Sequence, residues 1–144
     1  MRQVAAIIFC LLIGCTGHDP VQEAKDVIKS HEGYVAAGKL DAIVSNFADD
    51  IVILAPGMPL VEGNEACKEL YAGMLEMGEW EFSHDYHGAE LMGDAVALHG
   101  LAEGKTTGKD GTITTFANNF IIVFKYGPDG KLKFWRVAFA SNSQ

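Results

Sequence analysis

The chain has 144 residues, of which 49% are hydrophobic, so it is long enough for one domain with a buried core and too short for two. Its 19 acidic residues outnumber its 11 basic residues. Because no basic patch offsets the repulsion between this acidic chain and phosphates, we expect no nucleic-acid partner.

The first residues have the order of a bacterial lipoprotein signal. Arg2 precedes an apolar run at 4–13, and the run ends in Leu12-Ile13-Gly14-Cys15, which resembles the lipobox. This resemblance implies a signal peptide at 1–14, a lipidated Cys15 and a tether at 15–19. We expect anchoring at the bacterial cell envelope, on the outer membrane in a Gram-negative host. An ordinary secretory signal, and hence a secreted protein, is the alternative.

A first helix is predicted from Asp19 to about Gly38. Asp19 is a typical N-cap residue and Pro20 suits the first helical position, while Gly38 suits a position just beyond the end. Apolar residues recur at steps of three and four, which gives the helix one inner face. That face also carries His31.

Two more helices are predicted around a short strand. The second helix carries Phe47, and Asp49 and Asp50 are expected to end it, because their short side chains bond nearby backbone groups. An apolar strand at 51–54 follows, and then a loop broken by proline and glycine. The third helix is predicted over 64–77.

From residue 80 onward the pattern alternates between apolar and polar, which is typical of strands. Four strands are predicted, at 80–90, 95–103, 112–126 and 131–140. Turns that contain Gly and Asp separate them, so successive strands form hairpins and the sheet is antiparallel. Three helices followed by such strands indicate an α+β domain with the helices on one face of a curved sheet.

Two segments resemble a known family: AAGKLDAIVSNFADDIVILAPGMPLVEGNEA at 36–66 and NNFIIVFKYGPDGKLKFWRVAFASN at 118–142. The resemblance is to the nuclear transport factor two-like superfamily, specifically its SnoaL-like, ketosteroid-isomerase-like group. It implies a cone-shaped domain at 20–144, with three N-terminal helices packed on a curved antiparallel sheet, and a homodimer. It does not imply one reaction, because this fold hosts isomerases, cyclases, dehydratases and proteins without known chemistry.

The resemblance also identifies three positions that carry catalysis in ketosteroid isomerases. The general base falls on Ala55, the tyrosine that holds the oxyanion falls on His31, and the protonated acid falls on Ile122. Alanine cannot accept a proton. We therefore expect the steroid-isomerase catalytic groups to be absent.

The same alignment predicts an apolar pocket inside the cone. Strand side chains alternate between two faces, so if Ile122 faces inward, its neighbours two and four positions away do so too. His31 and Asn118 would orient a ligand there. The predicted lining consists of Tyr34, Ala55, Trp80, Phe82, Tyr86, Phe116, Asn118, Phe120, Ile122, Trp135 and Phe139.

His84 joins His31 as a candidate catalytic residue. It shares a strand face with Tyr86, while Asp85 and His87 share the other face, so His84 has no carboxylate on its own strand face. Because His84 and His87 point to opposite faces of the strand, they would not converge on a metal ion. We expect neither a metal site nor a cofactor. For both candidates the alternative is a structural hydrogen bond in the core or the cavity wall.

Three hypotheses on function remain open. The first is an envelope-tethered domain that binds a small apolar or aromatic molecule in the cone. The second is a general acid–base enzyme of isomerase, cyclase or dehydratase type that acts on a small carbonyl compound, with His31 or His84 in place of the missing carboxylate. The third is a homodimeric association domain whose sheet packs against an identical sheet.

Overall fold

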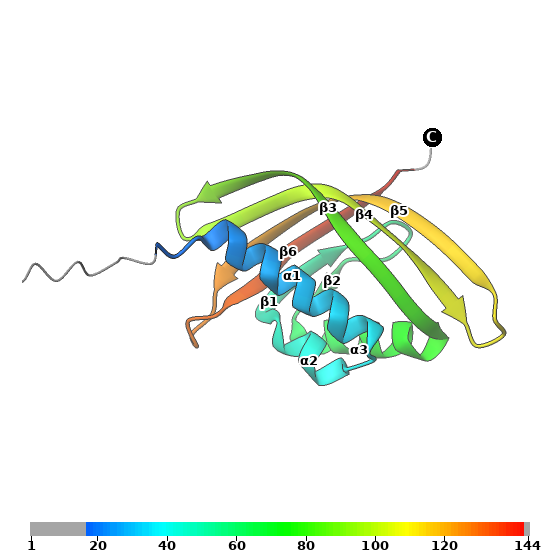
Figure 1. Ribbon diagram of the computed structural model, residues 1–144. Helices are drawn as coiled ribbons and strands as arrows, with labels where there is room; N and C mark the ends of the chain where they lie inside the picture. The colour runs from blue at the N-terminus through cyan, green and yellow to red at the C-terminus, as the bar shows by residue number, and fades with distance from the viewer. Residues whose placement is uncertain (1–16, 143–144) are drawn as a thin grey trace, which may run out of the picture.

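The computed structural model describes residues 17–142, and within them three helices and six strands (Figure 1). The helices are α1 (Pro20–Ala36), α2 (Leu40–Ser45) and α3 (Asn64–Met77). The strands are β1 (Phe47–Leu54), β2 (Val61–Glu62), β3 (Gly78–Met92), β4 (Ala95–Gly108), β5 (Ile113–Tyr126) and β6 (Leu132–Ser141).

The ends of α1 follow from local chemistry, as the sequence predicts. The Asp19 carboxylate accepts hydrogen bonds from the backbone N–H of Val21 at 3.0 Å and of Gln22 at 3.3 Å. At the other end Gly38 adopts a φ of 64°, a left-handed conformation that glycine takes without steric cost. The helix therefore begins and ends where its capping residues stand.

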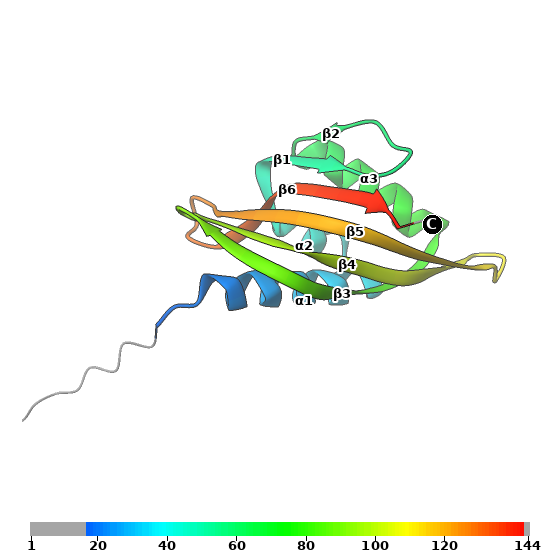
Figure 2. The same cartoon turned by 90° about the horizontal axis from the view of Figure 1, so that it is seen from above.

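The strands form one curved sheet in the order β2-β1-β6-β5-β4-β3. The hairpin pairs β3–β4, β4–β5 and β5–β6 are antiparallel, as predicted, whereas β1 lies parallel to β6. The three helices lie on the concave side of this sheet, and Figure 2 shows how far the long strands extend beyond them. This arrangement confirms the α+β fold class.

The concave side is closed at one end and less covered at the other. Phe120, Ile122 and Phe124 on β5 are at most 3% exposed, and the rings of Phe124 and Phe134 lie 4.8 Å apart. Farther along the sheet, Trp80 and Phe116 are only half-buried. The wider end of the cone is thus lined by partly accessible aromatic rings.

The second helix is shorter than predicted, and the strand after it is longer. The helix ends at Ser45, and Asp49 and Asp50 lie inside β1, so the prediction that this pair ends the helix is wrong. The Asp50 carboxylate accepts hydrogen bonds from Lys125 at 2.7 Å and from the indole N–H of Trp135 at 3.0 Å. Distant strands therefore hold these residues extended.

Trp135 lies on the convex face, contrary to the prediction that it lines the cone. The register shifts between Val123 and Phe124, so that Val123 pairs with Arg136 but Phe124 pairs with Phe134. This bulge places the 4% exposed Phe134 in the core and turns Trp135 outward, because one extra residue interrupts the alternation of faces. The Trp135 ring then packs against the side chains of Lys125 and Arg136.

Candidate functional site

A buried carboxylate and imidazole form the chemically most distinctive pair on the concave side. Glu32 on α1 accepts a 2.9 Å hydrogen bond from Nδ1 of His84 on β3, and the same oxygen accepts the backbone N–H of His84 at 3.1 Å. The side chains of His84 and Glu32 are only 4% and 8% exposed. Lys29, on the outer side of α1, donates to the other Glu32 oxygen at 3.0 Å.

The pairing with Glu32 fixes which nitrogen of His84 carries the proton. The two bonds from His84 orient the imidazole and assign its proton to Nδ1, so that Nε2 carries the lone pair. Burial lowers the pKa of His84, and the hydrogen bond and negative charge of Glu32 oppose that shift. The ring is therefore neutral near pH 7 and stabilised by Glu32 when it takes up a proton.

Aromatic rings surround this imidazole. The ring of Phe120 stands edge-on to His84 at 4.9 Å, and Phe82 stands edge-on at 5.8 Å. His84 and Asn118 belong to one row across the sheet, because each pairs in register with Ala102 on the strand between them. Two strand spacings separate them by about 10 Å, so a small molecule could contact both the imidazole and the amide.

Tyr86 adds a phenol near the same carboxylate. Burial and the negative charges of Glu32 and Asp26 raise the pKa of Tyr86 to about 12. Its hydroxyl is therefore protonated at neutral pH. The ring is half-buried, 6.3 Å from that of Phe120, and Lys25 lies over it at 5.3 Å.

His31 lies in the core between α1 and α3, away from the accessible wall of the cone. It is 4% exposed, its Nε2 is 3.1 Å from the hydroxyl of Tyr71, and the rings of Phe47 and Phe134 flank it. Burial, and to a smaller extent the charge of His84, lower the pKa of His31 to about 3. A catalytic role for His31 stays a prediction, which this low pKa does not favour because the ring would not take up a proton near neutral pH.

The other predicted lining residues fall into two groups. Phe120 and Ile122 are buried in the closed end, where they are 3% and 1% exposed. The half-buried members are Tyr34, Ala55, Trp80, Phe82, Tyr86, Phe116, Asn118 and Phe139.

Glu32 was not predicted, although the sequence holds a signal for it. It stands four residues after Ile28 and three before Val35, so it belongs to the apolar inner face of α1. A carboxylate at such a position needs a buried partner. The partner is 52 residues away, and only the tertiary structure brings it to the helix.

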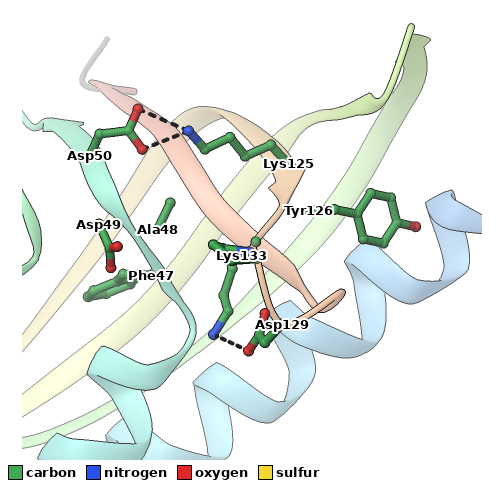
Figure 3. Close-up of a pocket in the computed structure, with 10 residues that line it drawn as sticks. Phe47, Ala48, Asp49, Asp50, Lys125, Tyr126, Asp129 and Lys133 are labelled. Atoms are coloured by element: carbon green, nitrogen blue, oxygen red, sulfur yellow. Dashed lines mark hydrogen bonds and ion pairs between the residues drawn. The ribbon is translucent and has the colours of Figure 1, made fainter.

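Two hollows open in the surface, and Phe82 lines the smaller one. Figure 3 shows the larger, of about 580 Å³, between the start of β1 and the β5–β6 turn. Ion pairs cross its rim, from Lys125 to Asp50 at 2.7 Å and from Lys133 to Asp129 at 3.3 Å. The second, of about 480 Å³, lies over β3 and β4 near Glu81 and Lys105. Neither hollow is lined by His84 or Asn118.

Within residues 17–142, no group of three or more His, Cys, Asp or Glu side chains is placed to hold a metal ion. In the same range, no helix is long and apolar enough to cross a membrane. On the concave side, the Glu32 carboxylate holds the His84 imidazole beside aromatic rings.

The model of the SnoaL-like domain family matches residues 27–135. The chain belongs to this family. The match spans the Glu32–His84 pair and most of the sheet of this SnoaL-like domain. A search of curated proteins gave no match to it.

Solved structures share the fold of this SnoaL-like domain at low sequence identity. A ketosteroid isomerase-like protein from Erwinia carotovora atroseptica SCRI1043 has a TM-score of 0.76 at 17% identity, covering 88% of this chain and 99% of its own. A nuclear transport factor 2-like superfamily protein from Salmonella enterica serovar Typhimurium LT2 has a TM-score of 0.76 at 12% identity, covering 85% and 91%. The family match confirms the predicted SnoaL-like resemblance, and these likenesses to solved structures show the fold alone.

Proposed function

We propose that this SnoaL-like domain is a general acid–base enzyme that moves a proton on a small, largely apolar carbonyl compound. The observation that carries the proposal is the buried pair of Glu32 and His84, in which the carboxylate holds the imidazole in one tautomer. Burying a charged carboxylate without a partner is costly, so this pair is a specific arrangement. It supplies the carboxylate that His84 lacks on its own strand face.

The proposed step removes a proton from the carbon next to the carbonyl group. Nε2 of His84 takes that proton, the electron pair of the C–H bond moves into an enolate, and the new imidazolium is stabilised by Glu32. The imidazolium then returns the proton to the same carbon or to a conjugated one. The Asn118 amide and the Tyr86 hydroxyl are the nearby neutral donors for the enolate oxygen.

A binding domain without chemistry is the second candidate. The half-buried rings of Trp80, Phe82 and Phe116 give the wide end of the cone an apolar surface that could hold a flat molecule. This surface supports binding and catalysis equally. The two functions are therefore distinguished by substituting His84 and measuring whether the reaction rate or the ligand affinity changes.

Deuterium exchange at the acidic carbon of 2-tetralone, a small aromatic ketone, tests the proposal. We expect His84→Gln to slow the exchange about 100-fold while ligand-observed NMR shows unchanged affinity for the ketone. His99→Gln, an exposed histidine on β4, is the matched control and should keep the full rate. Binding by the unaltered domain without any exchange above buffer would favour the binding domain instead.

The pH profile distinguishes a positioning role of Glu32 from a structural one. The base must be neutral, so the rate falls as the pH drops through the pKa of His84, which burial places below the ordinary 6.5. Glu32 raises the pKa of His84, so the acidic limb of the pH profile should move to lower pH in Glu32→Gln. The rate of exchange should fall as well. A variant that is merely less stable would lose rate without moving the limb.

We also propose that a lipidated Cys15 anchors this domain at the bacterial cell envelope. Residues 1–16 lie outside the described part of the chain, so the support is the order of charge, apolar run and cysteine in the sequence. Radiolabelled fatty acid fed to the producing bacterium should label the protein, and Cys15→Ser should abolish the label. Label that persists in the variant would overturn the anchor.

A further inference from the structure

We propose that the closed end of the cone rests directly on the membrane surface, a proposal that builds on the lipid anchor at Cys15. We call this surface the basal end. It consists of the β3–β4 turn with Leu91 and Met92, the β5–β6 turn with Lys131, and the start of the described chain at His18. The proposed partner is a bilayer with anionic headgroups.

The sheet register brings these parts to one edge. Met92 pairs with Ala95, Ala95 with Lys125, and Lys125 with Lys133, so both turns lie at the same end of the strands. Figures 1 and 2 show the start of α1 at that end too, with the β4–β5 turn at the opposite end. Leu91 and Met92 are 61% and 48% exposed there.

The tether is fixed to this end by a cluster of three side chains. Nε2 of His18 lies 2.6 Å from the hydroxyl of Tyr126, at the end of β5, and 2.8 Å from a carboxylate oxygen of Glu23. Tyr126 also donates to Glu23 at 2.8 Å. Because Cys15 is only three residues before His18, an anchored lipid would lie within about 11 Å of the basal end.

The basal end is not basic, since Asp19, Asp94 and Asp129 accompany Lys131 there, but the side of the molecule that carries α3 is more acidic. Residues 125–136 carry four basic side chains and one acidic one, whereas residues 64–81, on α3 and the start of β3, carry five acidic side chains and one basic. Lys131 is exposed, although Asp129 beside it and Asp50 near Lys125 offset part of the positive charge. An anionic surface would therefore repel the α3 side more strongly than the basal end.

This orientation determines from where the site is reached. Asn118 lies eight residues along β5 from Tyr126, which is about 26 Å of extended strand. The wide end of the cone would therefore open away from the bilayer. A ligand would enter from the aqueous side rather than out of the lipid.

The test attaches the protein to vesicles through an artificial N-terminal tether, so its outcome does not depend on lipidation or on catalysis. Residues 17–142 contain the whole core, from Ala24 to Val137, so they can be used with a hexahistidine tag in place of residues 1–16. The protein is bound to vesicles of phosphatidylethanolamine and phosphatidylglycerol that contain a nickel-chelating lipid. A fluorophore is attached at Met92→Cys or, as the matched control at the far hairpin tip, at Ile113→Cys. Cys67 is fully buried and should not be labelled.

Spin-labelled lipid should quench the Met92→Cys probe about threefold more than the Ile113→Cys probe. Adding Leu91→Ser and Lys131→Glu to the Met92→Cys protein should remove most of this difference. Equal quenching of the two probes, stronger quenching at Ile113→Cys, or no quenching at either would overturn the proposal. Circular dichroism of each protein in solution confirms that the fold is retained.

Discussion

His31 and His84 are both buried, yet their surroundings give them different chemistry. His84 meets a carboxylate, so its protonated form has a stabilising partner inside the protein. His31 meets the hydroxyl of Tyr71 and two phenylalanine rings, and its Nδ1 has no hydrogen-bond partner within the described residues. Of these two histidines, His84 is therefore the one that suits the proposed proton transfer.

The enclosure of His31 predicts a loss of stability in mild acid. Its pKa falls from 6.5 to about 3 on folding, so below pH 6.5 the unfolded chain binds a proton that the native state does not. The free energy of unfolding should then fall by about 1.4 kcal/mol per pH unit from this residue. At pH 5 the contribution of His31 to the loss is about 2 kcal/mol relative to pH 7.

Urea unfolding of the wild-type domain and of His31→Gln at pH 7 and pH 5 measures this contribution. The glutamine can still bond Tyr71 but does not titrate, so the variant should lose about 2 kcal/mol less between the two pH values. His84, whose pKa is also lowered, leaves a residual pH dependence in both proteins. An identical loss in the two proteins would show that His31 is not protonated on unfolding.

At the scale of elements, local signals were sufficient where local groups stabilise the structure. Asp19 and Gly38 mark the ends of α1 because the bonds that cap a helix come from residues next to it. The start of β1 was not predictable in this way. Its Asp50 is held by Lys125 and Trp135, which are 75 and 85 residues away, so a pair that favours a helix end lies in a strand instead.

In the candidate site, too, local patterns predicted some positions and long-range contacts decided the others. Alternation along β3 correctly places His84 with the aromatic residues, because one strand face repeats every second residue. It misplaces Trp135, since a bulge changes the count and nothing in the sequence of β6 reveals it. Glu32 was not predicted for a different reason. Its partner His84 comes close only because α1 packs on the sheet.

At the scale of the whole molecule, the convex face of the sheet is a large surface that the helices do not cover. Leu54, Ala138 and Ile121 lie in one row across β1, β6 and β5, and Leu54 and Ile121 are 53% and 57% exposed. We propose that two copies pack through this face around a two-fold axis. If the basal ends of both copies rest on one membrane, that axis runs along the strands, so both cones open to the same aqueous side.

The predicted dimer depends on the exposed isoleucine at the β5 end of that row. Ile121→Lys would place an ammonium group from each copy in the proposed interface, so it should convert the dimer of residues 17–142 to a monomer in sedimentation equilibrium, with the fold unchanged by circular dichroism. Ile113→Lys changes an equally exposed isoleucine at the β4–β5 turn and should leave the dimer intact. A wild-type monomer at tens of micromolar, or a dimer that survives Ile121→Lys, would contradict pairing through the sheet. If the dimer forms, fluorophores at the two Met92→Cys positions should show energy transfer between copies, because the axis along the strands holds both basal ends together.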